Sequence, residues 1–151
     1  MIRKILLPAI GTILLLISCS KKPQCEKHFI QPGFIGKVKI YFDKKDGQKL
    51  TDKNGCIIYH ISDKGECFSA FAFDEKNIFI PGMFECFEMT GNNDVKEIPF
   101  FDSDTYWQDT LHNKDKKYMF YISRGYENLT GSDPNYVLEY YIDYGVNYKK
   151  H

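Results

Sequence analysis

The sequence lacks the features that would assign it to several common functional classes. Its 20 basic residues are balanced by 20 acidic ones, so it has no excess of positive charge of the kind that marks nucleic-acid-binding proteins. It contains no H-E-x-x-H, C-x-x-C or Gly-x-Ser-x-Gly motif, and its four histidines are scattered. We therefore expect no metal, no cofactor and no enzymatic activity. Internal repeats and interdomain linkers are also missing, which predicts a single domain.

No apolar run is long enough to cross a bilayer. The longest covers residues 5–17 and follows Arg3 and Lys4, whereas a transmembrane helix needs roughly 20 apolar residues. A basic start followed by an apolar run of about 7 to 15 residues is typical of a secretory signal peptide. The run ends in Leu-Ile-Ser-Cys at positions 16–19. This ending resembles the bacterial lipobox.

The lipobox resemblance implies a lipid anchor. In proteins of that type the signal peptidase cuts just before the cysteine, and the cysteine thiol is diacylated. Residues 1–18 would then be the signal peptide, and Cys19 would be the lipidated first residue of the mature chain. Acyl chains contribute about 0.8 kcal/mol per buried CH2, so two or three of them anchor a protein stably. The alternative is an ordinary signal peptide, or a buried first strand with a chance cysteine.

Residues 19–27 are polar and are interpreted as a tether between the anchor and the domain. Ser20, Lys21 and Lys22 follow the cysteine, with no Asp and no acidic cluster. In diderm bacteria an Asp there often retains a lipoprotein at the inner membrane. By resemblance, this chain is similar to outer-membrane lipoproteins that face the periplasm. A monoderm host would place the same anchor on the outer face of its only membrane.

Short alternating runs dominate the rest of the chain. Val38, Ile40 and Phe42 alternate with polar neighbours, as in a half-buried strand. The 12 Phe and 11 Tyr residues also favour strands over helices. We predict an antiparallel β sandwich of about seven to eight strands over residues 28–146, followed by a polar tail at 147–151. The other predicted strands are 56–61, 66–73, 78–89, 95–101, 118–123 and 137–143, with a hairpin turn at 62–65.

One resemblance extends beyond the signal peptide. Residues 29–42, with the core Pro-Gly-Phe-Ile-Gly-Lys-Val at 32–38, resemble the opening of an uncharacterised family of bacterial lipoproteins. Members share a Pro, Gly, aromatic, Gly and Val series, then Asn-Gly and a strand with a Gly after its turn. In this chain the Asn-Gly is at 54–55, the strand at 57–61, and the glycine after its turn is Gly65. The residue that members usually have between Pro and Gly is missing here. The resemblance implies a lipid-anchored domain of unknown function and no catalytic residues.

Four cysteines remain once Cys19 is lipidated, an even number that favours disulfides in an exported protein. The predicted hairpins favour pairing Cys67 with Cys86, provided that the Pro-Gly break before Cys86 absorbs a two-residue offset. Cys25 would then pair with Cys56. If the break turns the chain away, Cys56 becomes the partner of Cys86. A further alternative is that some of the four are free cysteines in the core.

Two function classes fit these observations. The first is a non-enzymatic envelope lipoprotein that binds another envelope protein or stiffens an assembly. The second is a binder of a small sugar-like ligand, in which exposed aromatic rings form a stacking platform. The candidate platform residues are Tyr106, Trp107 and Tyr141.

The lipid anchor gives the first testable prediction. Metabolic labelling with an alkyne analogue of palmitate should tag the wild-type protein, because acylation requires the Cys19 thiol. The Cys19→Ala variant should remain unlabelled. Equal labelling of the two proteins would show that Cys19 is not the acylated residue.

Overall fold

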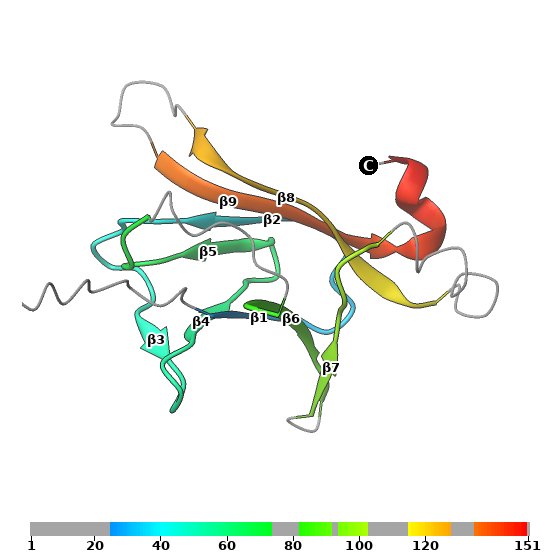
Figure 1. Cartoon of the computed structure of the whole chain (residues 1–151), viewed down its shortest axis with the longest axis horizontal. Helices are drawn as coiled ribbons and strands as arrows, with labels where there is room; N and C mark the ends of the chain where they lie inside the picture. Colours follow the sequence, from blue (N-terminus) through cyan, green and yellow to red (C-terminus); the bar gives the residue numbers. More distant parts are fainter. Residues whose placement is uncertain (1–24, 74–81, 92–93, 103–114, 128–134, 151) are drawn as a thin grey trace, which may run out of the picture.

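The computed structural model describes residues 25–73, 82–91, 94–102, 115–127 and 135–150. Within them the chain forms nine strands in two sheets and one short 3-10 helix, so the all-β prediction is confirmed (Figure 1). The elements are β1 (Glu26–Ile30), β2 (Gly36–Tyr41), β3 (Leu50–Thr51), β4 (Ile57–His60), β5 (Glu66–Phe68), β6 (Phe84–Met89), β7 (Val95–Glu97), β8 (Lys117–Glu127), β9 (Asn135–Tyr144) and η1 (Gly145–Lys150).

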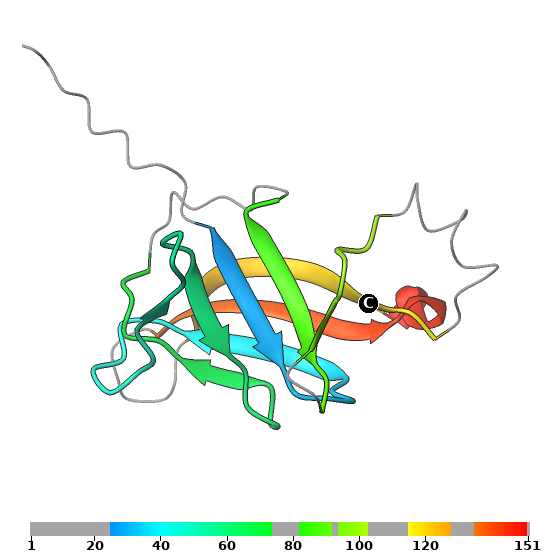
Figure 2. The same cartoon turned by 90° about the horizontal axis from the view of Figure 1, so that it is seen from below.

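The strands form two layers. Sheet A has five strands in the order β3-β4-β1-β6-β7, and sheet B has four in the order β5-β2-β9-β8. Figure 1 shows the two sheets facing each other, and Figure 2 shows that the central strands of sheet A run across those of sheet B. The central strand of sheet A is therefore β1, the first strand of the domain.

The prediction of a strictly antiparallel arrangement is wrong. Strand β1 is parallel to both β4 and β6, and β2 is parallel to β5. Parallel neighbours require a crossover, because a tight turn can join only antiparallel strands. Here the crossover passes through the other sheet: the chain leaves sheet A after β1, forms β2 in sheet B, and returns to sheet A. An alternating apolar–polar pattern shows which face of a strand is buried, but it does not show which sheet the strand joins.

The predicted hairpin at residues 62–65 is wrong for the same reason. The turn itself exists, since the backbone N–H of Gly65 donates to the carbonyl of Ser62 at 3.0 Å. However, β4 before the turn belongs to sheet A, and β5 after it pairs with β2 in sheet B. The turn is therefore a corner between the sheets.

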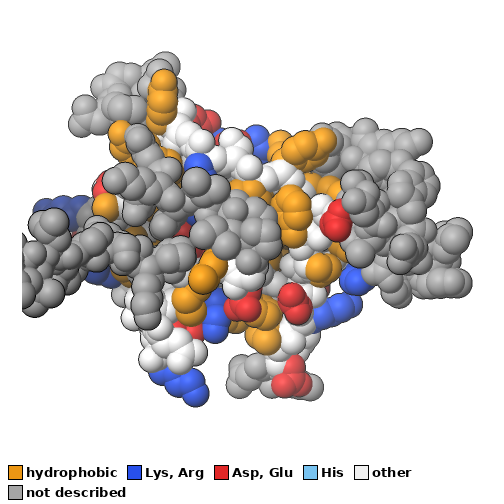
Figure 3. All heavy atoms as spheres, viewed as in Figure 1, with side chains coloured by type: hydrophobic (Ala, Val, Ile, Leu, Met, Phe, Trp, Pro, Cys, Tyr) orange, Lys and Arg blue, Asp and Glu red, His pale blue; other side chains and the backbone are white. Residues whose placement is uncertain are grey.

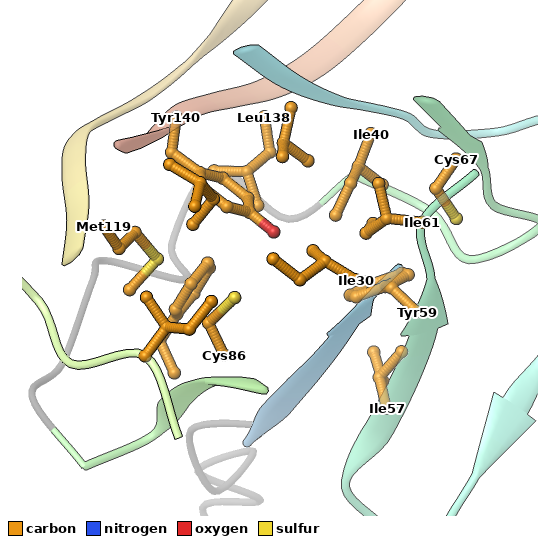
Figure 4. Packing of buried hydrophobic residues seen from close by; sticks show 14 of the residues in the cluster. Ile30, Ile40, Ile57, Tyr59, Ile61, Cys67, Cys86, Met119, Leu138 and Tyr140 are labelled. Carbon is orange, nitrogen blue, oxygen red and sulfur yellow. The ribbon is translucent and has the colours of Figure 1, made fainter. Parts of the chain in front are cut away.

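The core lies between the inner faces of the two sheets. Val38 and Ile40 of β2 point inward, as their alternation predicts, and Leu138, Tyr140 and Ile142 of β9 lie beside them. Figure 4 shows Ile40, Leu138 and Tyr140 facing residues of sheet A, with the Tyr140 hydroxyl pointing into the middle of the core. The other buried members are Ile30, Phe42, Ile57, Tyr59, Ile61, Cys67, Phe84, Cys86, Ile98 and Met119.

Two boundaries differ from the predicted ones. Strand β1 begins at Glu26, two residues inside the segment 19–27 that we interpreted as tether. The helix η1 overlaps most of the predicted polar tail at 147–151. Strand β7 lies at an edge of sheet A.

The cysteine pairing is half confirmed. Cys25 and Cys56 form a disulfide with their Cα atoms 4.7 Å apart. The predicted bond between Cys67 and Cys86 is wrong, because both are free buried thiols. Cys67 lies on β5 in sheet B and Cys86 on β6 in sheet A, so the two strands are not neighbours.

The corner at Gly65 gives a prediction about stability. Gly65 has φ +81°, and a Cβ there would overlap the carbonyl oxygen of Lys37 and the ring of Phe34. Gly65→Ala should therefore combine backbone strain of roughly 1–2 kcal/mol with a steric cost of roughly 1–3 kcal/mol. Urea unfolding of the soluble domain measures the loss.

Gly55→Ala is the matched control. Gly55 has φ +83°, but no atom lies within 4 Å of a Cβ placed there. This variant should lose only the backbone part of the free energy of unfolding. If both variants lose the same amount, the close approach at Gly65 does not limit the substitution.

Candidate functional site

The inner face of β1 is unusual in its polarity. Glu26, His28 and Ile30 point into the core, and Lys27 and Phe29 point the other way. Two of the three inward side chains on the central strand of sheet A are thus ionisable. Buried ionisable groups are rare and need partners, so we take the cluster around them as the candidate functional site.

Glu26 is neutralised from the opposite sheet. Both of its carboxylate oxygens lie 3.0 Å from Nη2 of Arg124 on β8. The side chains are 4% and 15% exposed for Glu26 and Arg124, respectively. Burial by itself raises the pKa of the Glu26 carboxyl, but His28 and Arg124 together more than offset burial and hold the pKa below 4.5. Glu26 is therefore ionised at neutral pH.

His28 lies between this ion pair and Tyr140. Its Nδ1 is 3.0 Å from the Tyr140 hydroxyl, and its Nε2 is 3.5 Å from a Glu26 oxygen. The rings of Phe84 and Tyr59 pack at centroid distances of 4.1 and 5.0 Å. Burial lowers the pKa of His28 below 6.5, although Glu26 opposes this effect. The imidazole is thus neutral at pH 7, and a proton on Nε2 lets Nδ1 accept from the tyrosine hydroxyl.

The chain of contacts continues to a thiol. Cys86 is the residue opposite His28 in the β1–β6 register, and the Tyr140 hydroxyl interacts with its thiol. Burial raises the pKa of the Cys86 thiol to about 12, and burial raises that of Cys67 to about 12 as well. Both cysteines are therefore neutral thiols, and reactive cysteines need thiolate character.

Three polar atoms of the cluster have no hydrogen-bond partner among the described residues. They are Nε2 of His28, the hydroxyl of Tyr59 and Nε of Arg124. Each unsatisfied buried group costs about 1–3 kcal/mol. These unsatisfied groups therefore lower the stability of the core, although the cluster also contains an ion pair.

The order of acid, imidazole and hydroxyl resembles a nucleophilic triad, but the geometry does not suit one. Tyr140 and His28 are fully buried, and burial raises the pKa of the Tyr140 hydroxyl well above 10. A substrate has no access to a hydroxyl at this depth. What the arrangement can do is link the two sheets and respond to protonation.

The residues predicted from sequence do not gather at this cluster. Cys19, Tyr106 and Trp107 lie outside the described residues. Tyr141 lies on the outer face of sheet B, where the Lys37 ammonium sits 5.2 Å from its ring centroid. Of the four predicted disulfide candidates, Cys86 lies opposite His28 in the β1–β6 register.

The cluster residues were missed because they carry no motif. Glu26 falls in the predicted tether, and His28 was noted only as one of four scattered histidines. The available signal was the alternation of Glu26, His28 and Ile30 with Lys27 and Phe29. That signal is weak because polar residues occupy both faces of the strand.

The described residues show no other candidate of this kind. They contain no group of three or more His, Cys, Asp or Glu side chains that could hold a metal ion. Among the same residues, we find no helix whose length and apolar character would allow it to cross a membrane.

Comparison with known proteins adds a shared fold. No protein-family model matches this chain, and no curated protein matches its sequence significantly. The crystal structure of a protein from Bacillus anthracis, described as a candidate lipoprotein, is similar with a TM-score of 0.53. The two are 8% identical, and the match covers 78% of this chain and 68% of that one. At this identity the likeness establishes the fold alone.

The ion pair gives a prediction about stability and pH. Arg124→Met leaves Glu26 buried without its partner and should lower the free energy of unfolding by about 3 kcal/mol at pH 7.5, as breaking a buried pair does. In the wild type the pKa of Glu26 is lowered, so its contribution is present above pH 4.5 and is lost as the pH falls further. In the variant, burial raises that pKa. The difference in stability between the two proteins should therefore shrink from pH 7.5 to pH 4.

Lys37→Met is the matched control, because Lys37 pairs with Glu139 at 3.4 Å on the exposed face of sheet B. It should change the free energy of unfolding by about 1 kcal/mol or less. Urea titrations at several pH values measure all three proteins. A constant difference between the wild type and Arg124→Met across this range would contradict the role given to Glu26.

Proposed function

We propose that this chain is an exported lipoprotein, cleaved before Cys19 and held on a membrane by acyl chains on that residue. The observation that carries the proposal is the disulfide between Cys25 and Cys56, which begins six residues after the lipobox cysteine. Disulfides persist in the oxidising compartments that lipoproteins face. The fold shared with a candidate lipoprotein supports the same assignment.

The domain on this anchor acts as a non-enzymatic module that binds another envelope protein. Support comes from the burial of the one acid–imidazole–hydroxyl series among the described residues, which no substrate can reach. The face in Figure 3 supports a protein partner in a general way, since charged and hydrophobic side chains are interspersed on it. Mixed surfaces of this kind are typical of non-obligate protein interfaces.

The anchor belongs to the outer membrane, with the domain in the periplasm. The support is the sequence after Cys19, where Ser20 and two lysines stand in place of an inner-membrane retention signal. In a host with one membrane, the outer face of that membrane is the corresponding location.

The sugar-binding alternative gains less support. Of its three candidate residues, Tyr141 is the one described, and Lys37 lies over one face of its ring. A sugar stacks on a free ring face, so the lysine leaves one face at most for a ligand.

The anchor gives a prediction about localisation. After cell breakage, the wild-type protein should remain with the membrane fraction in high salt and pass into detergent, because acyl chains hold it. The exported Cys19→Ala variant should be soluble in the same compartment and should still contain the Cys25–Cys56 disulfide. Fractionation followed by non-reducing peptide mapping measures both properties.

Retention of Cys19→Ala on the membrane would contradict lipid anchoring. Reduced Cys25 and Cys56 in the exported protein would contradict the proposal that the domain lies in an oxidising compartment. The two outcomes are independent, because the first concerns the acyl chains and the second the redox environment.

A further inference from the structure

The three central strands of sheet A begin at the same end of the domain. Figure 2 shows β4, β1 and β6 side by side with their arrowheads pointing the same way. Glu26 is paired with Ile57 on one side and with Phe84 on the other. The residues just before these strands therefore lie together.

We call this end of the domain the start end. It consists of Cys25, the β3–β4 turn at Asp52–Cys56, and Gly82–Met83. Backbone hydrogen bonds join its parts: the Ile57 N–H donates to the carbonyl of Cys25 at 2.9 Å, and the Glu26 N–H donates to that of Met83 at 2.7 Å. The opposite end, the far end, contains the turns at 31–35 and 62–65.

Only a short length of chain separates the start end from the lipobox cysteine. Cys19 and Cys25 are six residues apart, which fully extended chain spans in about 20 Å at most. The disulfide with Cys56 fixes Cys25 to the neighbouring strand. The tether therefore cannot lengthen by peeling the beginning of β1 away from the sheet.

The far end lies about as far from the start end as the tether can extend, so it meets the membrane only if the tether folds back along the domain at full length. From Cys56 to Ser62 the chain runs along β4, and six residues of extended strand cover about 20 Å. Each end has one exposed turn lysine, Lys53 at the start end and Lys64 at the far end, so the difference in charge comes from the tether. Lys53 is exposed in the β3–β4 turn, where Figure 3 shows basic side chains projecting at the lower left. The tether that leads into the start end also carries Lys21 and Lys22, and lysines are attracted to an anionic membrane surface.

We propose that the start end faces the lipid headgroups of the membrane that carries the anchor, and that the far end faces away from it. This inference rests on the proposed acylation of Cys19. Its partner is the bilayer surface. The turns at 31–35 and 62–65 are then the part of the described domain presented to the surrounding compartment.

Two matched lysines test the orientation. Lys53 and Lys64 are both exposed, and each lies in a turn closed by a positive-φ glycine that donates to the carbonyl three residues back at 3.0 Å. Lys53→Cys and Lys64→Cys carry a bimane fluorophore at the start end and at the far end, respectively. The wild type should take up no label, because Cys67 and Cys86 are buried.

The full acylated protein is reconstituted into vesicles of phosphatidylethanolamine and phosphatidylglycerol that contain a lipid with a nitroxide headgroup. Quenching of bimane should be several-fold stronger at position 53 than at position 64. Asn54→Cys and Asp63→Cys repeat the comparison at the neighbouring exposed positions of the two turns. Equal quenching at the two ends, or stronger quenching at position 64, would overturn the proposed orientation.

Flotation of the same samples separates the two proposals. Wild-type protein that floats with the vesicles, combined with equal quenching at both positions, keeps the lipid anchor and rejects the orientation. Acylated protein that fails to float rejects both.

Discussion

The carboxylate of Glu26 is the constraint around which the domain is organised. It lies on the central strand of sheet A, in a core where an unpaired charge could not be tolerated. Its register neighbours on sheet A are Ile57 and Phe84, and His28 beside it on β1 is a neutral imidazole. The positive charge therefore comes from sheet B, through Arg124 of β8. This pair fixes how the two sheets face each other, since sliding either sheet would leave both charges buried and alone.

The connections between the two sheets follow from the directions of the strands in sheet A. Strand β1 has neighbours on both sides that begin at its own end, so neither β4 nor β6 can follow it through a tight turn. Each connection has to travel the length of the domain, and the chain uses that journey to build sheet B. At Gly65 the corner between the sheets brings the chain so close to the backbone of β2 that no side chain fits there.

Much of the fold could be predicted from sequence wherever one face of a strand is apolar. Val38 and Ile40, and likewise Leu138 and Tyr140, place β2 and β9 correctly because their alternation reflects burial on one side. Strand β1 was not predicted in this way, because its buried face includes the polar residues Glu26 and His28. Turn residues predicted the turn before Gly65 but not the sheet that the next strand joins, and the wrong Cys67–Cys86 bond followed from that. The candidate site could not be predicted, because its partners come from β1, β8 and β9, which only the tertiary fold brings together.

The position of the Cys25–Cys56 disulfide has a mechanical consequence. If Cys19 carries the proposed lipid anchor, a pull on the anchor enters the domain at Cys25, next to the first residue of β1. Because β4 and β6 run parallel to β1 on either side, the two ladders of hydrogen bonds are loaded together in shear and are not unzipped one bond at a time. The covalent bond passes part of the tension to β4 at the point of entry. The segment before Cys25 thus joins the domain at the disulfide-linked central strand of sheet A.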